Sequence, residues 1–137
     1  MGGLVSLRYK APIIAISPAR LTAEEKKLLD KFTSKVHNEG KEEMLQAALA
    51  GFCQIWRIPN GIVVTEIIER WGERQLWFSF LAGKGVLKLL DDLEPFFLDY
   101  GKRHGCKKVI GDTPNKAMQR IYARRWKELS RTYGRDL

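Results

Sequence analysis

The sequence predicts an α/β domain in which an antiparallel three-strand meander is followed by a glycine turn, a helix, a strand and a last helix. Two observations support this prediction. Across residues 52–81, strand-like apolar segments are separated only by Pro59–Gly61 and Trp71–Glu73, both good tight-turn sequences. On either side of this region the apolar residues recur at helical spacing.

The N-terminal third predicts one strand and two helices. The apolar run Pro12–Ile16 is typical of a short strand. Thr22 and Glu25 form a capping box, which marks a helix start. The first helix is expected to end near Asn38 and Gly40, because apolar residues continue along one face: Leu21, Leu28, Leu29, Phe32 and Val36. A second helix is predicted over 41–50, with four residues turned inward: Met44, Leu45, Ala48 and Leu49.

Three strands are predicted over 52–58, 62–69 and 74–81, and they form the meander. Apolar spacing then predicts a helix from Val86 to Tyr100, which Pro95 is expected to kink or split in two. A strand follows over 107–110, and a last helix begins at Pro114.

Composition predicts one folded domain over residues 1–137, with 1–10 as a candidate flexible start. No apolar run approaches the ~20 residues that span a bilayer, so no membrane segment is expected. Cys53 and Cys106 lack ligand-like neighbours and are expected to be reduced thiols in a reducing compartment.

The net charge of +8 is concentrated near the C-terminus. Residues 101–135 hold eleven Lys or Arg and two acidic residues, while the rest of the chain is close to neutral. Such a patch attracts phosphate, on a nucleic acid or on a nucleotide cofactor. The alternative is a solvated basic surface that keeps the protein soluble.

The glycine turn carries the clearest functional signal. Gly83, Lys84 and Gly85 lie between a predicted strand and a predicted helix, where backbone N–H groups can point at an anion. The alternative is a tight turn that needs glycine for its positive φ alone.

The order of elements resembles the GNAT superfamily of acyl-CoA N-acyltransferases over roughly residues 10 to 128. In that family the loop after the fourth strand carries Arg/Gln-x-x-Gly-x-Gly/Ala. Here residues 80–85 keep both glycines, with Phe80 in the leading place. The last helix of the family often carries Asn, Ala and Tyr at the spacing of Asn115, Ala117 and Tyr122.

The resemblance implies a central mixed sheet, an antiparallel meander plus a parallel strand, flanked by helices. Family members usually end with two further strands, whereas only about nine residues follow the last predicted helix. The C-terminal strands are therefore expected to be truncated, and the edge left exposed is a candidate for pairing in a homo-oligomer.

The resemblance also implies transfer of acetyl from acetyl-CoA to an unknown amine. Tyr122 is then the candidate acid and Glu66 and Glu69 the candidate bases. Each has an alternative structural interpretation: a core aromatic for Tyr122 and a solvated strand face for the two carboxylates. The residues implied for binding the cofactor are Leu81, Gly83, Lys84, Gly85, Val86 and Asn115.

A non-catalytic module is the second hypothesis. Truncated GNAT-like proteins occur among the virion and accessory proteins of tailed bacteriophages, so the location is expected to be the cytoplasm or a virion. The predicted last helix has a basic side that could contact a protein partner or nucleic acid: Lys116, Arg120, Arg124, Lys127 and Arg131. Binding to nucleic acid would be independent of sequence and sensitive to salt.

Overall fold

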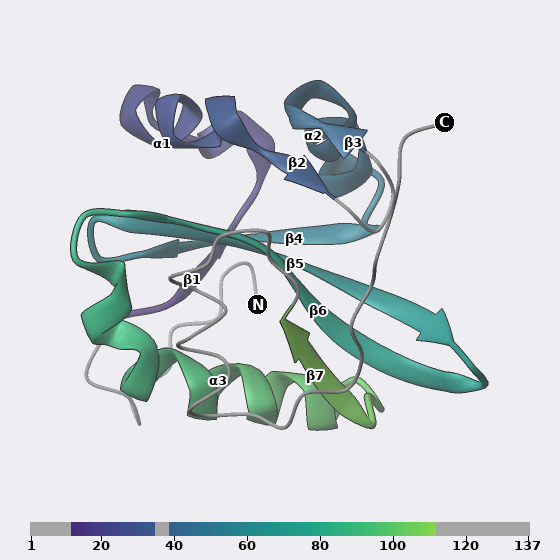
Figure 1. Ribbon diagram of the computed structural model, residues 1–137. Helices are drawn as coiled ribbons and strands as arrows, with labels where there is room; N and C mark the ends of the chain where they lie inside the picture. The colour runs from purple at the N-terminus through teal and green to yellow at the C-terminus, as the bar shows by residue number, and fades with distance from the viewer. Residues whose placement is uncertain (1–11, 35–38, 112–137) are drawn as a thin grey trace, which may run out of the picture.

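The computed structural model describes residues 12–34 and 39–111 (Figure 1). The elements follow in the order β1 (Ile14–Ile16), η1 (Pro18–Arg20), α1 (Ala23–Leu28), η2 (Leu29–Lys31), β2 (Thr33–Ser34), β3 (Glu39–Gly40), α2 (Lys41–Leu49), β4 (Cys53–Ile58), β5 (Gly61–Arg70), β6 (Glu73–Gly83), η3 (Val86–Leu89), α3 (Leu90–Arg103) and β7 (Lys108–Gly111). The three-strand meander, the second helix and the strand after α3 are therefore confirmed.

The main sheet has the strand order β1-β4-β5-β6-β7. Its strands are antiparallel, except that β7 pairs parallel to β6. Helices α1 and α2 lie on one face of this sheet and α3 lies on the other (Figure 1). The result is the mixed sheet flanked by helices that the sequence predicts.

Each face of the sheet buries its own apolar cluster. On the α3 face, Trp56 is 2% exposed and meets Phe96 and Phe97 edge to face, with ring centroids 5.4 and 5.3 Å away. On the α1 and α2 face, Met44 and Ile62 are fully buried. Burial on both faces fixes the register of the central strands, since a slip by one residue would turn every side chain to the opposite face.

The first helix is shorter than its apolar spacing predicts. The capping box of Thr22 and Glu25 forms as expected, but α1 ends at Leu28 and the chain is extended at Phe32. This turn brings the Phe32 ring edge-on to Phe80 of β6, with centroids 5.5 Å apart. Tertiary packing therefore overrides the helical periodicity.

Two other expectations are corrected. Leu49 was expected to face inward, yet it is 63% exposed at the last position of α2. Pro95 does not split its helix, because α3 runs through it from Leu90 to Arg103. The change from 3-10 to α geometry falls earlier, between Leu89 and Leu90.

Candidate functional site

The turn after β6 has the backbone conformation that its glycines allow. Gly83 has φ 142° and Gly85 has φ 73°, both in the range that side chains disfavour. At Gly85 a Cβ would meet no heavy atom within 4 Å. The turn therefore needs glycine for its backbone conformation, because nothing crowds a Cβ at Gly85.

The amides of this turn are not all available. The Lys84 N–H donates to the Asn60 carbonyl oxygen at 3.1 Å, which ties the turn to the β4–β5 loop. The Gly85 carbonyl accepts from the Lys88 N–H at 3.2 Å. The first amides of a helix have no partner within that helix, so Gly85 and the start of η3 are better placed than Lys84 to donate to an anion. The side chains of Lys84 and Lys88 are exposed and add positive charge.

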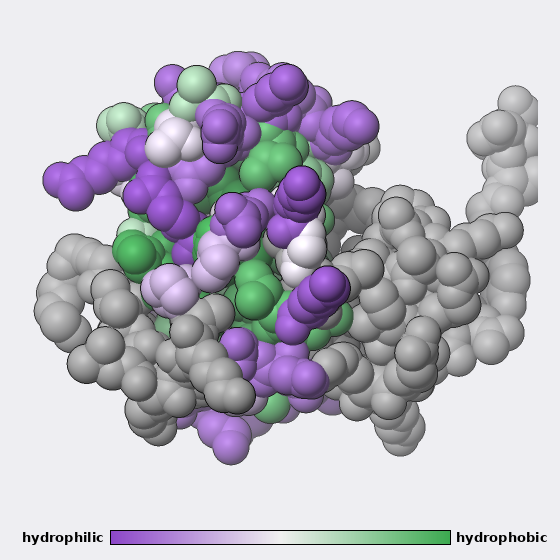
Figure 2. Space-filling model, turned by 90° about the vertical axis from the view of Figure 1, so that its left-hand side faces the viewer, coloured by the Kyte–Doolittle hydropathy of each residue, from purple (hydrophilic) through white to green (hydrophobic). Residues whose placement is uncertain are grey.

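The edge of β6 beside this turn has no neighbouring strand among the described residues. The last pair between β6 and β7 in the described part of the chain joins Phe78 to Gly111, where the description ends, whereas β6 continues to Gly83. Figure 1 places the β6–η3 connection and the β4–β5 turn at the same end of the sheet. Figure 2 looks onto that end and shows hydrophobic side chains exposed among hydrophilic ones.

A β-bulge interrupts β6 directly after Phe78, the last residue of β6 that pairs with a described residue of β7. Thr65 pairs with Phe78 and Val64 with Phe80, so Ser79 is the extra residue. Its hydroxyl oxygen is buried and has no hydrogen-bond partner in the described part of the chain. Sequence reasoning missed Ser79, because it treats the strand as regular, with residues spaced by two on the same face. The bulge adds one residue and breaks this alternation. Phe78 packs on the α3 side and Phe80 on the α1 and α2 side.

The two candidate bases do not lie together. Glu66 is 1% exposed and stands between Cys53 and Trp77 in the strand register. Glu69 is three positions further along β5, so it lies on the opposite face. Its carboxylate accepts from Arg74 Nε at 2.7 Å, and its side chain is 64% exposed.

The remaining predicted residues divide into two groups. Leu81 packs against the α3-face cluster, and Val86 begins η3 directly after the turn. The others lie outside the described residues: Asn115, Tyr122, Lys116, Arg120, Arg124, Lys127 and Arg131. The described residues include no cluster of His, Cys, Asp and Glu suited to a metal ion. They also include no helix long and apolar enough to cross a bilayer.

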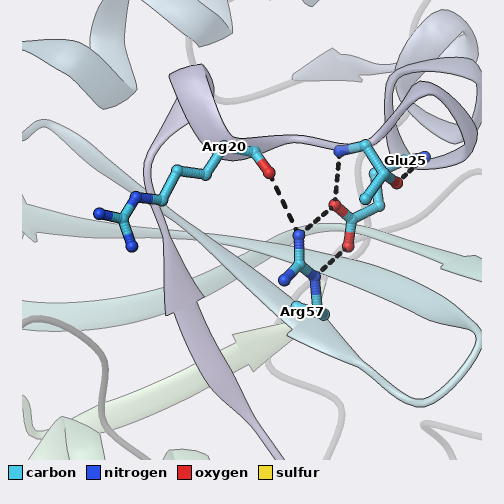
Figure 3. Close-up of polar contacts among 4 residues, drawn as sticks. Arg20, Glu25 and Arg57 are labelled. Atoms are coloured by element: carbon cyan, nitrogen blue, oxygen red, sulfur yellow. Dashed lines mark hydrogen bonds and ion pairs between the residues drawn. The ribbon is translucent and has the colours of Figure 1, made fainter.

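A partly buried ion pair between Glu25 and Arg57 fixes α1 to the sheet (Figure 3). The Glu25 carboxylate accepts from Arg57 Nε at 2.6 Å and from Arg57 Nη2 at 2.8 Å, and Nη2 also donates to the Arg20 carbonyl oxygen at 3.2 Å. The Thr22 N–H donates to the same carboxylate at 2.9 Å. The hydrogen bond from Arg57 is the main reason that the pKa of Glu25 lies below its usual value.

Comparison with known proteins identifies the fold. No family model and no curated protein sequence matches the chain. A ribosomal-protein-alanine N-acetyltransferase from Brucella melitensis biovar Abortus 2308 is similar in structure, with a TM-score of 0.66 and 13% identity over 93% of this chain and 99% of that one. The aminoglycoside acetyltransferase AAC(6')-Iy, solved with a bisubstrate CoA analogue, is similar with a TM-score of 0.64 and 16% identity over 93% of this chain and 97% of that one.

An acetyltransferase from Trypanosoma brucei gives a TM-score of 0.61 at 12% identity, over 93% of this chain and 100% of that one. Identities this low support a statement about the fold, and the sheet order described above agrees with it. The chain therefore has the GNAT-like α/β fold of these acetyltransferases.

Proposed function

We propose that this chain is a GNAT-type acyltransferase that binds acyl-CoA beside β6 and transfers the acyl group, acetyl in the first instance, to an amine. One observation carries the proposal. Among the described residues, β6 continues past its last pairing with β7 and leads directly into the glycine turn. Residues 79–83 of β6 would receive the pantetheine arm, and the turn would receive the diphosphate.

The described residues fit such a ligand. A phosphate group would lie in front of Gly85, where a Cβ would meet no atom within 4 Å, and the amides of Gly85 and of the start of η3 would donate to its oxygens. Lys84 and Lys88 would add charge, while the Lys84 N–H stays with Asn60. Leu81 and Gly83 precede the turn on the same strand.

Bound acetyl-CoA supplies a thioester as the acyl donor. The chain must then supply a base for the amine and an acid for the leaving thiolate. Glu66 is the proposed base, since it lies on the strand next to the bulge at Ser79. Glu69 is the second candidate, although it is ion-paired with Arg74. Tyr122 is proposed as the acid and Asn115 as a contact to the pantetheine arm.

One observation favours the alternative of a non-catalytic module, which would bind a protein or nucleic acid. The Lys84 amide, one of the three expected to hold a diphosphate, is already bonded to Asn60. This alternative predicts no effect of acetyl-CoA on stability, and retardation of mixed-sequence DNA in a low-salt gel if nucleic acid is the partner.

Two matched glycine variants test the proposal. Gly85→Ala and Gly51→Ala place a Cβ at similar positive φ values, 73° and 85°, with no atom within 4 Å in either case. Each should lower the free energy of unfolding by about 1 kcal/mol through backbone strain. Gly51 lies in the α2–β4 turn, away from β6. Only Gly85→Ala should therefore weaken acetyl-CoA binding, by about tenfold or more.

The measurement is calorimetric titration, supported by thermal unfolding. Wild-type protein should gain about 2.7 kcal/mol of stability when acetyl-CoA is present at 100 times its Kd. Absence of any heat or thermal shift at millimolar acetyl-CoA would refute acyl-CoA binding. Equal weakening by the two variants would show that the diphosphate lies elsewhere.

A further inference from the structure

The turn at the tip of the β5–β6 hairpin holds a tryptophan in a conformation that suits other residues better. Trp71 has φ 53° and Gly72 has φ 77°, and these two residues connect the paired Arg70 and Glu73. Two-residue turns of this kind favour Asn followed by Gly. The β4–β5 turn has such a residue, since Asn60 adopts φ 58° there. A bulky residue at positive φ is strained, so folding alone does not explain Trp71.

The side chain of Trp71 also adds little to the core, because the residue is 76% exposed. The guanidinium of Arg70 lies over its ring, 4.3 Å from the centroid, and is 5.6 Å from the ring centroid of Trp77. Since Arg70 covers one face of the Trp71 ring and most of the residue is exposed, the other face is available to a planar ligand.

The surface around this tip has an excess of positive charge. The tip meets the α3–β7 turn, where Arg74 Nη1 donates to the His104 carbonyl oxygen at 2.9 Å and the Lys107 N–H donates to the Arg74 carbonyl oxygen at 2.7 Å. Residues 69–74 and 99–108 hold six Lys or Arg and three Asp or Glu. Each of the three acidic residues is ion-paired with one of the basic residues. In the described part of the chain, the other basic residues have no ion pair: Arg70, Lys102 and Lys107.

An exposed aromatic ring beside cations without ion pairs is the combination that binds nucleic acid with unpaired bases. A base stacks on the ring, and the cations attract the phosphates. RNA presents unpaired bases of this kind in its loops, bulges and ends. An acidic peptide would use the cations alone and would leave the ring of Trp71 without a planar partner.

We propose that the tip of the β5–β6 hairpin binds single-stranded RNA, with one base stacked on Trp71 and phosphates held by the three basic residues without ion pairs. This surface is distinct from the basic side predicted for the last helix. The inference goes beyond acyl transfer and does not depend on it, because the hairpin tip and the glycine turn lie at opposite ends of β6.

The test measures the Kd of a labelled mixed-sequence RNA of about 12 nucleotides by fluorescence anisotropy. Trp71→Asn should weaken binding about tenfold through loss of one stacked base. It should melt no lower than wild type, because asparagine suits a positive φ. Trp71→Tyr keeps an aromatic ring and should bind within about threefold of wild type.

Phe52→Ser is the matched control. Phe52 is also an exposed aromatic residue, at 72%. It lies in the α2–β4 turn, and the strand that follows pairs with β5 only up to Glu66, about 17 Å along β5 from Trp71. Its replacement should leave the Kd for RNA unchanged.

An abasic strand of the same length separates stacking from attraction of phosphate. Wild type should bind this strand about tenfold more weakly than the RNA, and Trp71→Asn should cause no further loss. Arg70→Gln should weaken binding of both strands. It should also reduce the slope of log Kd against log salt by about 0.7, the value for one phosphate contact on a single strand.

Four results would overturn the inference. These are no binding of RNA by wild type at low salt, an unchanged Kd in Trp71→Asn, an equal loss of affinity in Phe52→Ser, and an equal loss of affinity for the RNA and the abasic strand in Trp71→Asn. The last result would mean that Trp71 does not stack on a base. Failure of the protein to bind acetyl-CoA would refute the proposed function and leave this inference standing.

Discussion

Replacement of Arg57 by methionine should lower the free energy of unfolding by about 2 kcal/mol. The substitution keeps most of the aliphatic stem and removes the guanidinium. Glu25 is only 7% exposed, and within the described part of the chain its carboxylate keeps the Thr22 N–H as a hydrogen-bond donor. A carboxylate stranded in this way is costly, because it has lost water without a full replacement.

The magnitude follows from the geometry of the pair. Two charge-assisted hydrogen bonds, at 2.6 and 2.8 Å, are lost. Such bonds contribute about 1.5–3 kcal/mol each when buried. The Arg57 side chain is 36% exposed, so solvent screens part of this energy, and a total of about 2 kcal/mol is expected.

A matched surface pair supplies the control. Arg103 donates to Asp99 at 2.7 Å within α3, with side chains 54% and 33% exposed. Arg103→Ala should therefore cost about 0.5 kcal/mol or less. The assay is urea unfolding of the Arg57→Met, Glu25→Gln, double and control variants. The double variant should lose about 1 kcal/mol less free energy of unfolding than the two single variants lose in sum, because it no longer holds an unpaired Glu25 carboxylate.

The same pair predicts a pH dependence. Because the folded pKa of Glu25 is lowered below 4.5, its contribution is fully present above that value and is lost as pH falls through the folded pKa. The difference in stability between wild type and Arg57→Met should therefore shrink in acid. The reasoning is refuted if Arg57→Met costs no more than Arg103→Ala at neutral pH.

Three further substitutions have defined outcomes in urea unfolding. Pro95→Ala should raise the free energy of unfolding by about 1–2 kcal/mol, because Pro95 is exposed and alanine restores an amide to the interior of α3. A lower free energy of unfolding would show that proline is required there. Trp71→Asn should raise it by about 0.5 kcal/mol, since relief of backbone strain at φ 53° outweighs the lost stacking of Arg70 at 4.3 Å. Net destabilisation would show that the stacking contributes more than the strain costs. Phe97→Ala should cost about 3–5 kcal/mol, because its ring is fully buried; a cost below about 1 kcal/mol would contradict the packing described.

The sequence predicts the sheet well because its strands carry strong local signals. Two tight-turn sequences lie between apolar runs, at Pro59–Gly61 and Trp71–Glu73. Both predicted hairpins form at these positions. The first helix shows where such reasoning fails. Phe32 continues the helical stripe in sequence, but in the fold its ring contacts Phe80, a residue 48 positions away. A contact of this range cannot be inferred from local periodicity.

The candidate site is predictable in part, for a similar reason. The glycine turn is visible as two glycines between a strand and a helix, and the structure shows that both have positive φ. The bond between Lys84 and Asn60 is not visible, because it joins two loops that only the folded sheet brings together. Ser79 is hidden as well, since a bulge depends on strand register and not on composition.

The central claim is that acyl-CoA lies along residues 79–83 of β6, with its diphosphate at the glycine turn. Titration of acetyl-CoA into ¹⁵N-labelled protein, followed through the backbone amide resonances, tests this claim most directly. The largest shifts are expected at Gly85 and Ser79, with little change at Gly51 in the α2–β4 turn. Shifts confined to other regions, or none at millimolar ligand, would contradict the account.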